Sequence, residues 1–162
     1  MHFNRAFSVR IAAATMAAVF VVVLAANEKP SDEFRETMRS NAGLVDLAGT
    51  SSFGKETNID AANGASLGEH IKAKDYEGIV ADALAIKANF EKLQPFWTGK
   101  NMEDAINFTK TGIKASGDLE TAAKAKDNAG ITAAHFAIAN ACRQCHLAHR
   151  VVMLTDRSFQ IR

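Results

Sequence analysis

The sequence of 162 residues predicts an all-α domain organised as an antiparallel four-helix bundle. Apolar residues recur at three- and four-residue steps in four segments, as they do on the buried face of a helix. We find no segment with the strict alternation of apolar and polar residues that is typical of a half-buried strand. Most connections between the four segments are short, which favours antiparallel neighbours.

The first helix is expected to begin at Pro30 and Ser31 and to end near Gly49. Two acidic residues occupy its first turn, where they interact favourably with the helix dipole. Residues 49–68 are rich in Gly, Ser, Thr and Asn and predict a long surface loop. The apolar face of this helix comprises Phe34, Met38, Ala42, Val45 and Ala48.

The second helix is expected to run from about Gly68 or Asp75 to Leu93. Pro95 and Gly99 follow it closely, and both residue types are frequent where helices end. The spacing of apolar residues therefore predicts one helix across this region.

The third and fourth helices are marked by their caps. Asn101 is a suitable N-cap for the third helix, because its side chain can accept a hydrogen bond from the first turn. Asp127 or Asn128 is expected to cap the fourth helix, which continues past Arg150.

The first 26 residues resemble a targeting segment. They contain two arginines, no acid and a charge-free run of 16 residues, which is shorter than the roughly 20 residues of a membrane-spanning helix. We expect residues 1–26 to be a secretory signal peptide and residues 27–162 to be the mature domain. An uncleaved N-terminal anchor is the alternative, because tilt and local thinning let a short helix span a bilayer.

The charge balance excludes one class of function. Removing Arg5 and Arg10 with the signal peptide leaves 17 of the 19 basic residues against 18 acidic ones. A net charge near zero predicts no nucleic-acid partner. The sequence also contains no recognisable constellation of catalytic residues, so we expect a protein that is not an enzyme.

The run Cys142-Arg143-Gln144-Cys145-His146 contains the side chains that we expect to bind a cofactor. On a helix, residues three apart lie on one face, so both thiols can reach the two vinyl groups of one haem. His146 follows directly and can bind the iron. The spacing predicts covalent attachment of one haem c, with Cys142 and Cys145 as thioether donors and His146 as the proximal iron ligand.

Two other interpretations of the pair of cysteines are weaker. A thioredoxin-like dithiol needs a βαβ setting, which the sequence does not show. A zinc site would have to take Cys142, Cys145, His146 and His149 from one helix, whereas structural zinc sites usually draw ligands from separated segments.

The position of the motif near the carboxyl end of an exported helical chain resembles class II cytochromes c, the cytochrome c-prime family. The stretch 122–127 resembles the last interhelical turn of that family, and Arg150 lies where its members commonly have a basic residue, while His149 departs from the usual Tyr or Phe. The resemblance implies an antiparallel four-helix bundle with haem near one end, a periplasmic location, redox partner proteins and a homodimer as a candidate assembly. No stable membrane insertion is implied unless the N-terminal segment is retained.

The sixth iron position separates two functions. Met38, Met102 and His70 are the candidates, and Met38 is the best, because the run from Met38 to Asn41 is similar to the segment that supplies methionine in low-spin members of the family. Methionines on an apolar face are, however, usually core residues. The family's basic residue tends to lie four before its ligand, whereas Arg35 lies three before Met38.

Arg35 is a candidate for pairing with a haem propionate, although an ordinary solvated face explains it as well. With Met38 bound, the protein is expected to be a periplasmic one-electron carrier, because a methionine ligand suits electron transfer. With the position open, it is expected to be a five-coordinate protein that binds nitric oxide or carbon monoxide.

Overall fold

The computed structural model describes residues 28–45, 66–152, 155 and 159–162. This part of the chain is mostly helical, which confirms the predicted all-α class. The predicted signal peptide, residues 1–26, and most of the predicted loop lie outside the described residues. The helices are α1 (Asp32–Val45), α2 (Leu67–Ala73), α3 (Tyr76–Gly99), α4 (Glu103–Lys124) and α5 (Asn128–His149), followed by strands β1 (Arg150–Val152) and β2 (Phe159–Ile161).

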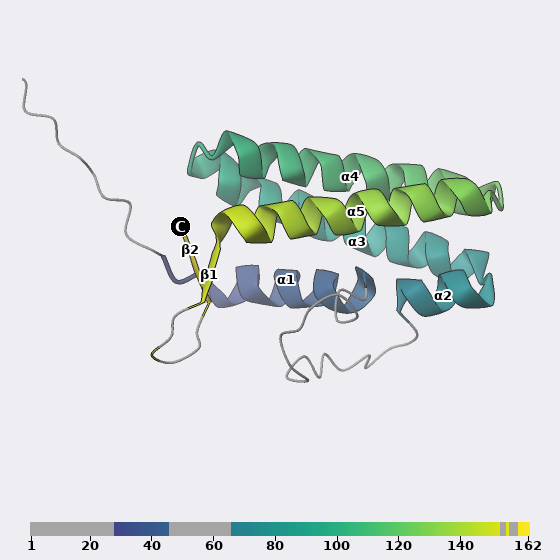
Figure 1. Ribbon diagram of the computed structural model, residues 1–162, viewed down its shortest axis with the longest axis horizontal. Coiled ribbons are helices and arrows are strands. Elements are labelled where there is room, and N and C mark those ends of the chain that lie inside the picture. The colour runs from purple at the N-terminus through teal and green to yellow at the C-terminus, as the bar shows by residue number, and fades with distance from the viewer. Residues whose placement is uncertain (1–27, 46–65, 153–154, 156–158) are drawn as a thin grey trace, which may run out of the picture.

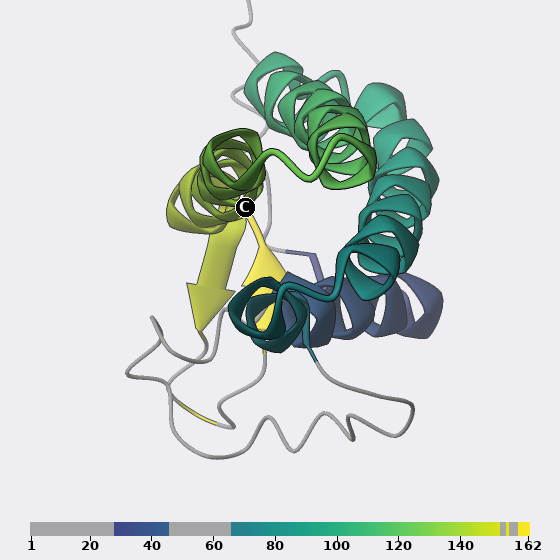
Figure 2. The same ribbon diagram turned by 90° about the vertical axis from the view of Figure 1, so that its right-hand side faces the viewer.

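The long helices lie side by side around a common core (Figures 1 and 2). Helix α4 packs between α3 and α5, and α4 runs in the opposite direction to both. Helices α1 and α2 follow one another along the remaining side, where α1 packs mainly on α3 and only sparsely on α5. Within the described part of the chain, none of the helices is long and apolar enough to cross a bilayer.

Capping residues explain where several helices begin. The hydroxyl of Ser31 accepts a hydrogen bond from the backbone N–H of Phe34 at 3.2 Å, as expected for the start of α1. The carboxylate of Asp127 accepts one from Ala129 N at 3.1 Å at the start of α5. Both starts agree with the sequence prediction, whereas α4 begins one residue later than predicted, with Met102 at the N-cap.

Of the two predicted starts of the second helix, Asp75 is confirmed as the N-cap of α3, whereas Gly68 belongs to a separate short helix, α2. Lys74 adopts a left-handed conformation with φ of 55° and ends α2. Asp75 then caps α3 by accepting a hydrogen bond from Gly78 N at 3.1 Å. The cap therefore satisfies the N–H of Gly78, one of the backbone groups that the start of a helix leaves without an intrahelical partner.

Helix α3 continues past Pro95 to Gly99, so the predicted end near Leu93 is wrong. Beyond the proline, Phe96 and Trp97 pack against Phe34 of α1, with ring centroids 4.4 and 5.6 Å away. Trp97 is only 2% exposed. This aromatic packing stabilises the helical turn that follows the proline.

The C-terminal segment forms a small antiparallel sheet that the sequence did not predict. Arg150 pairs with Ile161 and Val152 with Phe159. The fourth helix consequently ends at His149 and does not continue past Arg150. The guanidinium of Arg162 donates hydrogen bonds to the carbonyls of Ala148 and Leu147, at 2.7 and 3.0 Å, and so satisfies the last turn of α5.

Candidate functional site

A cavity near the C-terminal end of α5 brings the predicted site residues together. Helix α5 contributes Cys142, Cys145 and His146, and α1 contributes Met38 and Asn41. Aromatic and aliphatic side chains from α3 and α4 complete the wall, among them Phe90, Leu93, Trp97 and Phe108.

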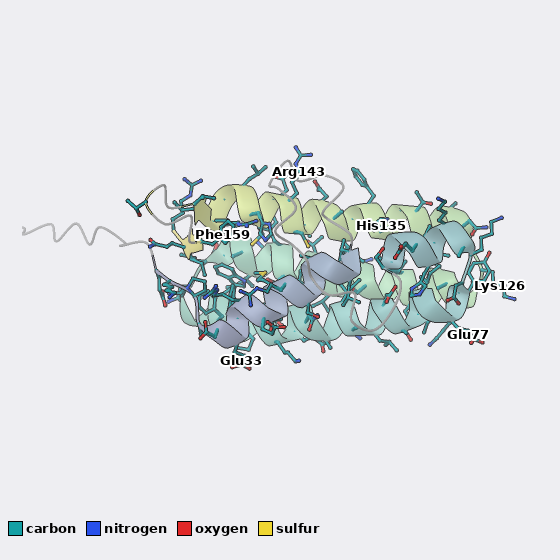
Figure 3. The ribbon with its side chains drawn as sticks, turned by 90° about the horizontal axis from the view of Figure 1, so that it is seen from below. Glu33, Glu77, Lys126, His135, Arg143 and Phe159 are labelled. Carbon is teal, nitrogen blue, oxygen red and sulfur yellow. The ribbon has the colours of Figure 1, made fainter. Side chains whose placement is uncertain are left out.

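The two cysteines lie on the buried face of α5, as their spacing predicted. Each residue is 8% exposed, and the thiols are not joined in a disulfide. Arg143, between them, is exposed and points outward from α5 (Figure 3). Burial raises the pKa of Cys142 to about 12, with a smaller contribution from Cys145, so this sulfur stays protonated at neutral pH. Burial also raises the pKa of Cys145 to about 11, with Asp104 adding to the shift.

His146 follows the second cysteine on the wall of the cavity. Burial lowers its pKa to about 4, and the nearby positive charge of Arg150 adds to the shift. The imidazole is therefore neutral at neutral pH, which is the form that binds a metal. The guanidinium of Arg150 itself lies over the ring of Phe159, 3.6 Å from its centroid.

Met38 reaches the same cavity from α1, where its side chain is partly buried. The neighbouring cations do not line the cavity. Arg35 pairs with Asp32 at 3.2 Å and Arg39 pairs with Glu36 at the same distance. The structure thus brings Met38, but not Arg35, to the cavity that the cysteine motif lines.

The other candidate ligands from the sequence have different surroundings. His70 lies on α2, where its Nδ1 is 2.7 Å from Asp82 Oδ2. Met102 occupies the N-cap of α4 and is not part of the cavity wall. His149 packs against Trp97, and its Nε2 lies 3.0 Å from Asp104 Oδ2.

The zinc site considered from the sequence is not formed. Across the residues that the structure describes, no three His, Cys, Asp or Glu side chains are grouped so that they could hold a metal ion. The interactions of His149 with Trp97 and Asp104 instead hold the end of α5 against α3 and α4.

The donor set fits a haem in three respects. Two free thiols and a neutral imidazole from α5 line one cavity with a thioether from α1. The remaining surface is largely apolar, which suits a macrocycle. Asn41 lines the same cavity, and its buried Oδ1 has no hydrogen-bond partner among the described residues, as expected of a group that faces a ligand.

The cavity is small in this conformation. Its volume is about 20 Å³, room for about one water molecule. A macrocycle therefore requires α1 and α5 to lie further apart than they do here. The sparse packing between these two helices makes their separation less costly than that of α3 and α4, which pack along most of their length.

Several wall residues were not predicted as site residues. Asn41 had a recognisable signal, because it is a polar residue three positions after Met38, on the apolar side of α1. Phe90, Trp97 and Phe108 showed only the helical periodicity of ordinary core residues.

Comparison of the chain with protein-family models, with curated proteins and with solved structures finds no match.

Proposed function

We propose that the protein is an exported monohaem c-type cytochrome that carries single electrons, with His146 and Met38 as the axial ligands of its iron. The class II cytochrome c family is the proposed family, and α1 with α2, α3, α4 and α5 form the proposed antiparallel four-helix bundle. The periplasm is the proposed location, because haem attachment to such a motif suits an exported chain.

One observation carries the proposal. Met38 lines the same cavity as Cys142, Cys145 and His146, although it lies on a different helix at the other end of the chain. A thioether and a neutral imidazole are the two ligands that a six-coordinate electron carrier needs.

The residues of the chain have separate roles in this function. Cys142 and Cys145 would hold the cofactor by thioether bonds, and His146 and Met38 would bind its iron. When bound, the haem would supply an iron ion that accepts or releases one electron. Phe90, Trp97 and Phe108 exclude water from the cavity, and an apolar environment favours the less charged oxidation state of the iron centre.

The first test is covalent attachment of haem to the full-length chain made with haem-attachment machinery. We expect a mass increase of one haem per chain that survives denaturation. Replacing both cysteines, Cys142→Ser with Cys145→Ser, abolishes this increase, whereas the control Arg143→Lys retains it because that side chain is exposed. Protein that remains colourless under these conditions would refute the proposal.

The second test distinguishes electron transfer from gas binding. We expect a low-spin spectrum with a sulfur-to-iron band in the oxidised protein and no response of the reduced protein to carbon monoxide. A high-spin spectrum that changes with carbon monoxide would instead support a five-coordinate gas binder.

A further inference from the structure

Asn41 of α1 is a buried polar residue whose side-chain oxygen is unpaired within the part of the chain that the structure describes. The residue is 3% exposed, and its Oδ1 has no hydrogen-bond partner among the described residues. Leaving a buried polar atom unpaired is costly. Such an atom persists in a folded protein when it serves a ligand or a partner that completes its hydrogen bonds.

The surroundings of Asn41 identify the direction in which that partner lies. The side chain lines the cavity between α1 and α5. Thr109 lies on the same wall, but its hydroxyl donates to the carbonyl of Ala105 at 2.8 Å, so its proton is already used. Asn41 is also three residues after Met38, so the two side chains lie next to each other on one face of α1.

We propose that Asn41 is the positioning residue of the sixth iron position: its carboxamide hydrogen-bonds the atom held there, which is Met38 Sδ in the native protein. This inference rests on the proposed function. The carboxamide carries an acceptor and two donors, and a half-turn of its last torsion exchanges them. In that orientation the N–H takes the buried position that Oδ1 occupies here, and Oδ1 takes the position of the amide nitrogen, which is not among the buried unpaired atoms of the described residues. Its N–H can therefore donate to the free lone pair of the thioether sulfur and keep Met38 in one orientation.

The same amide would act on any other ligand in that position once Met38 is removed. A thioether is a weak acceptor, whereas an anion accepts a stronger, charge-assisted hydrogen bond. Cyanide is the anionic probe and carbon monoxide is the probe with little acceptor strength. Asn41 should therefore favour cyanide and have little effect on carbon monoxide.

The experiment compares Asn41→Leu with its parent in a Met38→Ala background of the haem-loaded protein. We expect the affinity of the oxidised protein for cyanide to fall by roughly tenfold or more. The affinity of the reduced protein for carbon monoxide should change by less than about threefold. Asn41→Ala, which adds no volume, is measured beside it so that the result does not depend on whether leucine fits.

Asn89→Leu is the matched control. Asn89 is also a buried asparagine, 8% exposed, but its Nδ2 donates to Ser40 Oγ at 3.0 Å and it is not part of the cavity wall. We expect this change to lower stability and leave both ligand affinities unaltered. Equal cyanide affinity with and without Asn41, or a parallel loss for both probes, would overturn the inference.

A further readout uses the native ligand. In the otherwise unchanged protein, Asn41→Leu should let imidazole displace Met38 at a lower concentration, seen as loss of the sulfur-to-iron band.

The results distinguish a failure of the proposed function from a failure of the role of Asn41. If Met38→Ala leaves a six-coordinate spectrum unchanged, another residue supplies the ligand and both the assignment of Met38 and the role of Asn41 are wrong. If Met38→Ala opens the sixth position of the iron and the affinity for cyanide does not depend on Asn41, only the role of Asn41 is wrong.

Discussion

Met38 of α1 and His146 of α5 line one cavity, and Trp97 of α3 lines it as well. This arrangement brings a thioether and a neutral imidazole to one cavity, where the proposed haem would bind. Met102, the other methionine in the described helical region, does not line this cavity. Replacing each of the two methionines in turn should therefore have different effects.

Replacing Met38 with alanine should open the iron of the haem-loaded protein. We expect the sulfur-to-iron band to disappear and the reduced protein to bind carbon monoxide. Met102→Ala, which removes the same side chain at the N-cap of α4, should leave the spectrum unchanged. A spectrum that responds to Met102→Ala and not to Met38→Ala would show that the ligand has been misassigned.

Trp97 should report the presence of haem, since it is the single tryptophan of the chain and lines the cavity. A haem in that cavity should quench its fluorescence by energy transfer. We expect weak emission from the folded, loaded protein and a large rise when denaturant separates the helices. Bright emission from the folded, loaded protein would place the haem elsewhere.

Gly112 and Gly117, both on α4, should respond in opposite ways to alanine. A Cβ at Gly112 would lie 2.5 Å from the ring of Phe90, whereas one at Gly117 would meet nothing within 4 Å. Gly117→Ala should stabilise the protein by about 0.5–1 kcal/mol, because alanine favours a helix over glycine.

Gly112→Ala should destabilise the protein by about 1–3 kcal/mol, because Phe90 must shift within a packed core. Denaturant unfolding of both variants, followed by circular dichroism, measures the difference. Equal stabilisation by the two alanines would mean that α3 and α4 do not approach each other as closely as described.

Asp82 should make stability depend on pH. Burial raises the pKa of this carboxyl above its ordinary value of 3.8, while the hydrogen bond with His70 opposes the rise. The folded chain therefore holds this proton more tightly than the unfolded chain. Its stabilising contribution is present below pH 3.8 and is lost as the pH rises through the folded pKa.

The stability of the native protein relative to Asp82→Asn should accordingly fall as the pH rises through that range. His70 and Asp75 are the titratable neighbours of the carboxylate, so the pair of proteins is also compared in a His70→Gln background. Asp118→Asn is the control, because Asp118 is exposed and its partner Lys114 lies on the same helix. A difference that stays constant with pH would contradict the burial of Asp82.

Local patterns of the sequence were sufficient for part of this architecture. Helical periodicity predicted the all-α class, and Ser31 and Asp127 marked two helix starts that the structure confirms. The three-residue spacing of Cys142 and Cys145 predicted that both lie on one face of α5, and both are buried there. Each of these features depends on residues within one or two helical turns, which is why sequence reasoning could find them.

Only the tertiary structure decided the rest. Helix α3 continues through Pro95 because Phe96 and Trp97 pack on Phe34 of another helix, and the tail forms a sheet because β2 pairs with β1. Bringing Met38 and Asn41 to the cavity that Cys142, Cys145 and His146 line required α1 to pack beside α5. Contacts between residues so distant in the chain depend on how whole helix faces fit together, and helical periodicity carries no information about which faces meet.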